Sequence, residues 1–273
     1  MNSLGIAVIL GIVEGLTEFL PISSTGHLII AGHLFGFVGE KAASFEVVIQ
    51  LGAILAVVCL YGKRFARLWP RYRTSPGDQS KLDGWDGVWR IALATLPALL
   101  VGYLGRHAIK AHLFNPQAVT AALALGGVAI LLVEKLWSLR ALNPIDKLTL
   151  GQAFGIGLFQ ILALWPGTSR AAATIIGGML VGLDRKSAAE FSFLIAVPVL
   201  CAAGGYEMIK MHDQFVWQDA LELGCGFVVS FVVALLAVKG FVRFLERGKL
   251  TPFAWYRIVA APIFYILTRG MRF

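Results

Sequence analysis

Two short polar stretches interrupt the apolar sequence at corresponding places: Leu20-Pro21-Ile22-Ser23-Ser24-Thr25 and Trp165-Pro166-Gly167-Thr168-Ser169-Arg170. The apolar segments that follow, 27–38 and 171–182, are too short to cross ~30 Å of hydrocarbon at ~1.5 Å per residue. Polar backbone at membrane depth is tolerated only where it lines a cavity inside the protein. We therefore expect each stretch to form the tip of a re-entrant helix hairpin, which enters the membrane and returns to the same side.

The composition indicates that the whole chain lies in a membrane. Its 273 residues are 58% hydrophobic and 15% charged, with a mean hydropathy of +0.75, whereas soluble domains have ~45–50% apolar and ~25% charged residues. At ~20 residues per crossing helix, we expect one integral membrane domain over 1–273. A net charge of +8 can indicate nucleic-acid binding, but the basic residues lie in short loops between apolar segments. No nucleic-acid partner is expected.

The two stretches also indicate an internal repeat. Pro21 lies 145 residues before Pro166 (166 − 21), and Ser24 lies 145 residues before Ser169 (169 − 24). Other similar pairs follow downstream: Phe45-Glu46 with Glu190-Phe191, and Asn115-Pro116 with Thr251-Pro252. We expect an all-α polytopic membrane protein with two repeats, at about 1–138 and 149–273, each a re-entrant hairpin followed by three transmembrane helices.

The basic residues orient these repeats. Sixteen Lys and Arg residues lie in four segments, against 6 in the loops expected at the opposite end; the four segments are 61–90, 135–149, 184–187 and 239–251. Cytoplasmic loops are enriched in Lys and Arg, so these four segments are expected inside. Because each repeat has an odd number of crossings, the second repeat is expected to be inverted. Inverted repeats with broken helices place polar sites near the bilayer midplane, where we expect the two stretches to face each other.

Two glutamates in the first hairpin form a candidate metal site. Ionisable residues within a membrane are rare and costly, so each is a functional candidate. Glu14 and Glu18 are four residues apart and share one helix face. Two carboxylates can hold a divalent cation such as Mg²⁺ or Ca²⁺ through oxygen ligands. The alternative is a pair of glutamates near the membrane interface with no chemical role.

A cluster of hydroxyl groups follows these glutamates. Ser23, Ser24 and Thr25 directly precede Gly26 and His27. Either Ser24 or His27 can serve as the attacking group or its base, and the spacing does not choose between a phosphohistidine route through His27 and a route in which His27 activates Ser24. A histidine that only packs is the alternative for His27.

The second hairpin predicts an anion site. Thr168, Ser169 and Arg170 precede a helix that begins near Ala171. Free backbone N–H groups at a helix N-terminus favour phosphate, and arginine adds a planar fork that matches phosphate oxygens. An arginine that reaches to the membrane surface is the alternative. Together, the two hairpins indicate phosphoryl chemistry on a lipid that carries pyrophosphate.

These segments resemble a known family. The segment Glu14-Gly-Leu-Thr-Glu18-Phe-Leu-Pro-Ile-Ser-Ser-Thr-Gly-His27 resembles the E-x-x-x-E and S-S-T-G-H motif of the bacterial undecaprenyl pyrophosphate phosphatase family. Its P-G-x-S-R motif is similar to Pro166-Gly-Thr-Ser-Arg170. The resemblance continues in two further segments, so it runs essentially end to end: Phe45-Glu-Val-Val-Ile-Gln-Leu-Gly52 and Glu190-Phe-Ser-Phe193.

The resemblance implies removal of the terminal phosphate of undecaprenyl pyrophosphate on the outer, periplasmic side of the bacterial cytoplasmic (inner) membrane. This reaction regenerates the lipid carrier for peptidoglycan synthesis. It also implies a divalent cation and competition with bacitracin, which sequesters the same lipid. A homodimer is a further expectation.

Roles for the candidate residues follow from the resemblance together with the site chemistry. Arg170 is expected to clamp the pyrophosphate and to act in catalysis, with donors from Ser169 and Thr168. Glu14 and Glu18 are expected to position the metal, and Glu18 also to activate the attacking group. The expected catalytic residues are Glu18, Ser24, His27 and Arg170, and Ser23 and Thr25 are expected to contact the substrate.

One departure from the family pattern leaves rival functions open. The family motif continues P-G-x-S-R-S-x-x-T, whereas this chain has Ala171 at the second serine and Thr174 at the threonine. We expect slower or differently tuned turnover rather than loss of activity. The main rival is a polyprenyl-phosphate flippase or transporter, because inverted repeats with broken helices are a transporter architecture. A third possibility is a binding protein with a degenerate site.

Overall fold

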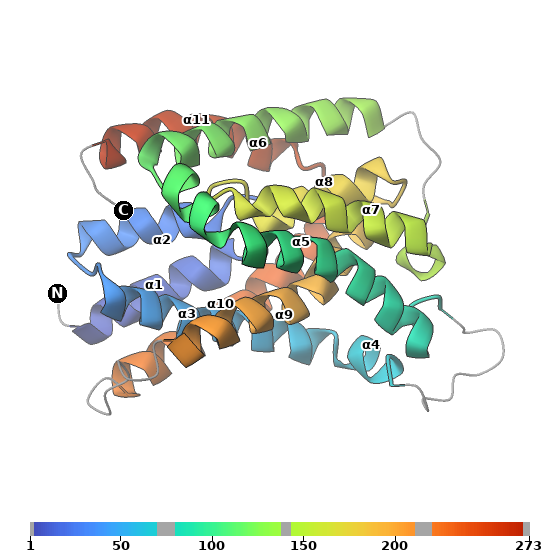
Figure 1. Ribbon diagram of the computed structural model, residues 1–273, viewed down its shortest axis with the longest axis horizontal. Helices are drawn as coiled ribbons and strands as arrows, with labels where there is room; N and C mark the ends of the chain where they lie inside the picture. Colours follow the sequence, from blue (N-terminus) through green and yellow to red (C-terminus); the bar gives the residue numbers. More distant parts are fainter. Residues whose placement is uncertain (1–2, 70–79, 138–142, 211–219, 270–273) are drawn as a thin grey trace.

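The computed structural model describes residues 3–69, 80–137, 143–210 and 220–269 (Figure 1). Within these ranges all regular secondary structure is helical, apart from one isolated bridge between Asn143 and Leu183. Five helices are long and apolar enough to cross a membrane: α3 (Glu40–Leu60), α5 (Gly84–Leu113), α6 (Pro116–Trp137), α9 (Arg185–Lys210) and α10 (Ala220–Leu245). The prediction of an all-α polytopic membrane protein is confirmed.

The sixth predicted crossing is α11 (Thr251–Thr268), which is not one of those five. It has 18 residues, but Pro252, Pro262 and the buried Arg257 make it less apolar than the others. A charged side chain inside a membrane normally faces the protein interior, and Arg257 is fully buried here. The charge of Arg257 is thus turned into the protein, and the crossing by α11 stays a prediction.

Two pairs of short helices form the predicted hairpins. The first consists of α1 (Ser3–Thr17) and α2 (Ser24–Leu34). The second consists of α7 (Leu150–Ile161), the 3-10 turn η2 (Leu162–Leu164) and α8 (Arg170–Leu180). Figure 1 shows α1 starting at the left end of the bundle and α7 at the right end, so the hairpins enter from opposite ends.

The order of elements recurs in the two halves of the chain. Hairpin α1/α2 precedes α3, α5 and α6, and hairpin α7/α8 precedes α9, α10 and α11. The two remaining short elements lie in connections: α4 (Gly62–Arg67) and η1 (Ile145–Lys147). This order supports the inverted repeat, which stays a prediction.

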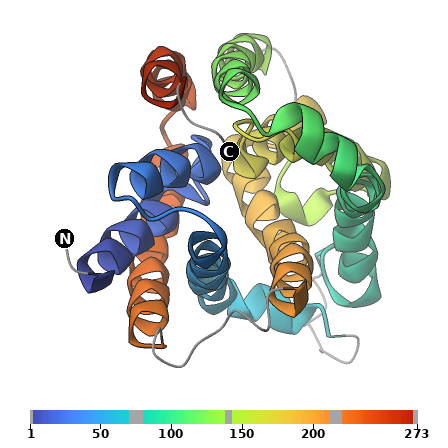
Figure 2. The ribbon, with the colours of Figure 1, turned by 60° about the vertical axis from the view of Figure 1, so that its left-hand side comes forward.

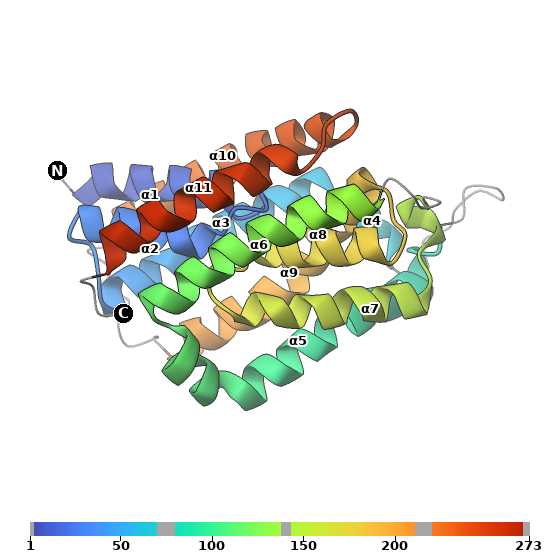
Figure 3. The ribbon, with the colours of Figure 1, turned by 90° about the horizontal axis from the view of Figure 1, so that it is seen from above.

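Glycines allow each hairpin to approach one long helix. A Cβ at Gly15 of α1 would lie 2.6 Å from the carbonyl oxygen of Ser230 in α10. A Cβ at Gly157 of α7 would lie 2.7 Å from that of Leu93 in α5. The close contact of α1 with α10 thus has its counterpart in the contact of α7 with α5 (Figure 3).

Ion pairs join the connections at the basic end of the bundle. Among the described residues, the pairs between different elements there are Arg64 with Asp146, Arg67 with Asp83 (2.8 Å), Arg185 with Glu134 (2.5 Å) and Lys186 with Glu246 (2.8 Å). Hydrogen bonds from the Arg64 guanidinium hold the pKa of Asp146 below its usual value. Of the basic residues counted above, Arg71, Arg73, Arg140 and Arg272 lie outside the described residues.

The core of the bundle lies around α9. Figure 2 shows α9 between α3 and α5, and it also packs against α8. Phe191 and Phe193 of α9 are fully buried, and Phe193 meets Phe19 edge to face with the ring centroids 5.6 Å apart. Since Phe19 belongs to the first hairpin, this core positions the hairpin tips inside the bundle.

Candidate active site

The two hairpin tips meet inside the bundle, as predicted. Ser169 Oγ lies 3.5 Å from the carbonyl oxygen of Leu20 and donates to it. Arg170 of the second hairpin forms an ion pair with Glu18 of the first at 3.0 Å. Both contacts join one hairpin to the other, so one composite site contains residues from both halves of the chain.

Two serines begin the second limbs of the hairpins in the same backbone conformation. Ser23 precedes α2 with φ 72°, and Ser169 precedes α8 with φ 69°. A non-glycine residue in this left-handed region costs ~1–3 kcal/mol and is concentrated at functional sites. The structural counterpart of Ser169 is therefore Ser23. The sequence alignment, which paired Ser169 with Ser24, was wrong by one residue. The second tip has one more residue between its proline and this serine than the first.

Glu18 lies at the centre of the site. It follows the last residue of α1, and its N–H still donates to the carbonyl of Glu14 at 2.9 Å, which continues the helical turn. Its Oε2 accepts a hydrogen bond of 2.6 Å from Ser24, and its Oε1 accepts one of 3.0 Å from Arg170. A carboxylate that holds the Ser24 hydroxyl this closely is placed to accept its proton.

Arg170 is held by three groups. Its Nη1 donates to the carbonyl oxygen of Ser192 at 3.0 Å and to the hydroxyl of Ser192 at 3.3 Å, and its Nη2 donates to Glu18. Its Cζ lies 5.5 Å from the centre of the Phe19 ring. Nε is buried and has no partner in the part of the chain that the structure describes. The guanidinium therefore keeps a free donor for an anion.

Ser192 is a site residue that the sequence analysis did not single out. Its hydroxyl also lies 2.7 Å from that of Thr174, in the position of the family threonine. A serine within an apolar helix gives no signal by itself. Ser192 lies in the segment from Glu190 to Phe193, which resembles the family. That resemblance was the signal by which Ser192 could have been found.

His27 makes contacts away from Ser24. Its Nδ1 lies 2.7 Å from the carbonyl oxygen of Ser23, and its Nε2 lies 2.5 Å from the hydroxyl of Tyr256. Since a carbonyl only accepts, Nδ1 carries the proton and Nε2 accepts from Tyr256. No hydrogen bond joins His27 to Ser24 among the described residues. Tyr256 was also missed, because a tyrosine in a membrane helix is unremarkable.

Glu14 is the carboxylate best suited to a cation. It is 1% exposed, and neither of its oxygens has a hydrogen-bond partner among the described residues. It lies in electrostatic range of Glu18, Glu46 and Arg170. The described ranges contain no cluster of three or more His, Cys, Asp or Glu side chains that could hold a metal. A buried carboxylate with both oxygens unpaired has the oxygen-ligand chemistry that a hard cation takes.

Two other predicted residues, Thr25 and Thr168, lie at the tips, and no side-chain hydrogen bond is seen for either within the described ranges. Thr25 is exposed at the start of α2, and Thr168 is half-buried, with its N–H donating to the carbonyl of Trp165 at 3.1 Å. Ala171 is fully buried in the apolar core. The hydroxyl that is absent at this position would therefore occupy a packed site.

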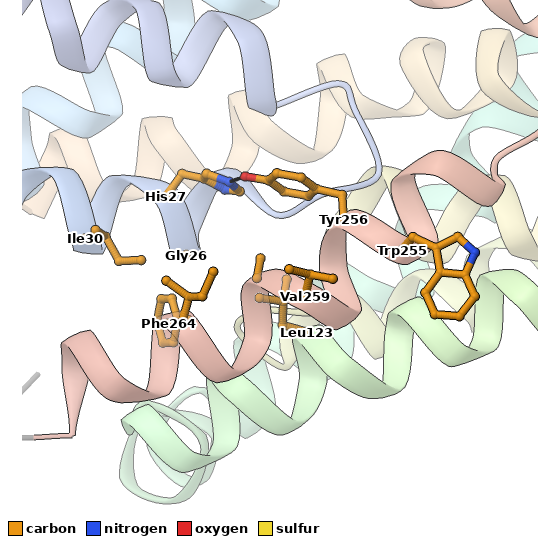
Figure 4. Close-up of a pocket in the computed structure, with 10 residues that line it drawn as sticks. Gly26, His27, Ile30, Leu123, Trp255, Tyr256, Val259 and Phe264 are labelled. Carbon is orange, nitrogen blue, oxygen red and sulfur yellow. Dashed lines mark hydrogen bonds between the residues drawn. The ribbon is translucent and has the colours of Figure 1, made fainter.

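An apolar pocket opens beside His27. It has a volume of about 450 Å³, and Figure 4 shows it between α2, α6 and α11. Gly26, His27 and Ile30 contribute from α2, and Leu123 contributes from α6. The other lining residues come from α11: Trp255, Tyr256, Val259, Ala260, Ile263 and Phe264. A polar site thus adjoins a cavity that suits a hydrocarbon chain.

Comparison with known proteins identifies relatives along nearly the whole chain. An undecaprenyl-diphosphatase of Maridesulfovibrio salexigens is 55% identical over 96% of this chain and 98% of its own length. One of Solidesulfovibrio magneticus is 55% identical over 95% of this chain and 96% of its own length. An undecaprenyl-diphosphatase of Nitratidesulfovibrio vulgaris is 51% identical over 97% of this chain and 98% of its own length.

A family model agrees with these relatives. The model of the bacitracin resistance protein BacA matches residues 7–263, a range that includes Glu14, Glu18, Ser24, His27 and Arg170. With this match and relatives at this level of identity, the chain belongs to the bacitracin resistance protein BacA family.

Proposed function

We propose that this chain hydrolyses undecaprenyl pyrophosphate to undecaprenyl phosphate and inorganic phosphate. The observation that carries the proposal is the contact of Glu18 with both Ser24 and Arg170, which joins a nucleophile, a base and an anion clamp inside the membrane. The names of the relatives support this substrate.

The reaction begins with attack by Ser24. Its Oγ bonds to the terminal phosphorus, and its proton passes to Glu18 Oε2, 2.6 Å away. The bond between that phosphorus and the bridging oxygen breaks, so the lipid leaves as its monophosphate. Water then attacks the phosphoserine, and the bond between phosphorus and Ser24 Oγ breaks. Glu18 returns its proton to Ser24 Oγ, and the protons of the water leave with inorganic phosphate.

Arg170 and the N-terminus of α8 hold the phosphate. The guanidinium donates parallel hydrogen bonds to phosphate oxygens, and its charge stabilises the negative charge redistributed during transfer. The N-terminus of α8, which begins at Arg170, adds the positive end of its helix dipole. Ser192 and Phe19 orient the guanidinium, since both contact it.

A divalent cation would be held by Glu14, whose buried carboxylate has both oxygens free. Such a cation, when bound, offsets phosphate charge and polarises a phosphoryl oxygen. Glu18 was predicted as the second ligand, but its two oxygens already accept from Ser24 and Arg170. Glu18 can bind the cation only if its hydrogen bond with Ser24 or with Arg170 breaks.

The lipid part of the substrate has a matching surface. The first isoprene units would lie in the apolar pocket beside His27, between α2, α6 and α11. His27 and Tyr256 lie at this pocket's polar side. This placement gives His27 a role in orienting substrate, and it favours Ser24 over His27 as the attacking group.

Location and partners follow from the same proposal. The excess of basic residues at one end of the bundle favours an inner-membrane protein whose site opens to the periplasmic side. Bacitracin would compete for the substrate because both recognise the lipid pyrophosphate.

A phosphate-release assay separates the proposal from a flippase. Purified chain in detergent, given undecaprenyl pyrophosphate, is expected to release phosphate, and the Ser24→Ala variant is expected to lose at least ~10³-fold in rate. Glu246→Gln, which alters a surface ion pair, is the control and should keep the parent rate. Transport requires no bond cleavage, so movement of lipid without phosphate release would overturn the proposal.

A further inference from the structure

Arg257 of α11 contacts the tips of both hairpins. It is fully buried, and its Nη1 donates to the carbonyl oxygen of Pro21 at 3.2 Å, while its Nη2 donates to that of Gly167 at 3.0 Å. It also donates to two carbonyl oxygens of α6, those of Leu123 (3.1 Å) and Ala122 (3.1 Å). One side chain thus ties both polar stretches to the α6 and α11 pair.

These four bonds need a guanidinium. Arginine has five N–H donors in a rigid planar fork, whereas lysine has three donors on one nitrogen. The carbonyls of Pro21 and Gly167 lie at membrane depth, where an unsatisfied polar group is costly. A single buried arginine satisfies both at once, and this fixes the distance between the two stretches.

The helix facing Arg257 leaves space for it. A Cβ at Gly126 of α6 would collide with Nη2 of Arg257 and would lie 2.8 Å from its Cζ. The first repeat has no equivalent arginine: Arg257 is five residues beyond Pro252, whereas Ala121 is five residues beyond Pro116. The arginine is therefore a feature of one repeat that serves the tips of both.

We propose that Arg257 is a positioning residue that holds the two hairpin tips at the spacing at which Glu18 and Ser24 face Arg170. All its hydrogen bonds in the described part of the chain go to backbone carbonyls. It acts on the reaction through the tips rather than by touching the reacting atoms. The inference rests on the proposed hydrolysis.

The first test compares two buried arginines. Arg90 donates to the carbonyls of Leu148 and Asp86, both at 2.7 Å, away from the hairpin tips. Arg257→Lys is expected to lower kcat ~10²-fold, because a misplacement of ~1 Å costs about that much, with KM changed less than ~3-fold. Arg90→Lys is expected to lose about as much thermal stability as Arg257→Lys but to keep kcat within ~2-fold of the parent.

A second pair of variants leaves Arg257 in place. Gly126→Ala crowds the guanidinium itself. Gly127→Ala crowds the same helix interface at Ile258 (2.8 Å), Ala254 (2.9 Å) and the Cβ of Arg257 (3.2 Å), away from the atoms that donate the hydrogen bonds. At matched thermal stability, kcat for Gly126→Ala should fall at least ~10-fold further than for Gly127→Ala. This pair tests the inference even if Arg257→Lys does not fold.

Amide hydrogen exchange tests the inference without activity. In Arg257→Lys and Gly126→Ala, peptides covering 18–26 and 164–172 should both exchange faster, while in Arg90→Lys and Gly127→Ala they should match the parent. Unchanged exchange in both tips, faster exchange in only one, or equal losses of kcat within the matched pairs would overturn the positioning role. If the parent protein releases no phosphate, the proposed hydrolysis is contradicted. The hydrogen-exchange result still tests whether Arg257 holds the tips.

Discussion

Arg170 and Glu18 lie 152 residues apart in the sequence, and their side chains form an ion pair of 3.0 Å between the two hairpins. Both side chains are less than one-tenth exposed. Removing one partner of a buried pair leaves the other charge uncompensated. The same pair therefore joins the two halves of the chain and orients the base toward Ser24.

Replacement of Arg170 tests the clamp. Arg170→Ala should reduce phosphate release by ~10²–10³-fold, as is typical for loss of a group that stabilises transition-state charge. Arg170→Lys should recover little, because an ammonium lacks the parallel donors of the fork. Rates are compared for protein first shown to be monodisperse by size-exclusion chromatography. More than about a tenth of the parent rate in Arg170→Ala would place the anion elsewhere.

The identity of the nucleophile is tested by trapping the phosphorylated enzyme. We expect an acid-stable phosphoserine at Ser24 after rapid quenching, because Ser24 contacts Glu18 and His27 contacts Ser23 and Tyr256 instead. Mass spectrometry of the quenched protein locates the phosphate. An acid-labile phosphate on His27, together with substantial turnover by Ser24→Ala, is the contrary result.

Metal dependence is tested at Glu14. A chelator should abolish phosphate release, and added Mg²⁺ or Ca²⁺ should restore it. Glu14→Gln should raise the cation concentration required for half-maximal rate at least ~10-fold, since the amide loses the charge that attracts a hard cation. Glu246→Gln is again the matched control. An equal cation requirement for the parent and Glu14→Gln excludes Glu14 as the ligand.

Membrane orientation is tested with single cysteines. Val38 lies in the connection between α2 and α3, and Lys81 lies at the basic end of the bundle; both are exposed. In a chain without its three native cysteines, an impermeant thiol reagent applied to intact cells should label Val38→Cys but not Lys81→Cys. Labelling of Lys81→Cys alone would reverse the predicted orientation.

Much of the fold was predictable because its signals are local. Pro21 and Pro166 break apolar sequence, and the short segments after them can form only helices that return to one side. The hairpins and the meeting of their tips followed from this pattern. The predicted crossing by α11 stays a prediction. Arg257 lowers the hydropathy of this helix, and its buried hydrogen-bond partners become known only from the structure.

The pairing within the site was not predictable from spacing. Glu14 and Glu18 share a helix face, which predicted a carboxylate pair, but Glu18 turns out to be paired with Arg170 from the other hairpin. That contact depends on how the halves pack, and so do the contact of Tyr256 with His27 and those of Arg257 with both tips. An intramembrane arginine is a functional candidate by default, so Arg257 did carry a usable signal.

The rates of phosphate release for Glu18→Gln, Arg170→Ala and the double variant test most directly whether the two hairpins form one phosphatase site. Residues that act as a unit have non-additive effects. The double variant is therefore predicted to lose no more activity than the worse single variant. A loss equal to the product of the two single losses, or release of phosphate at the parent rate by either single variant, would contradict a shared site.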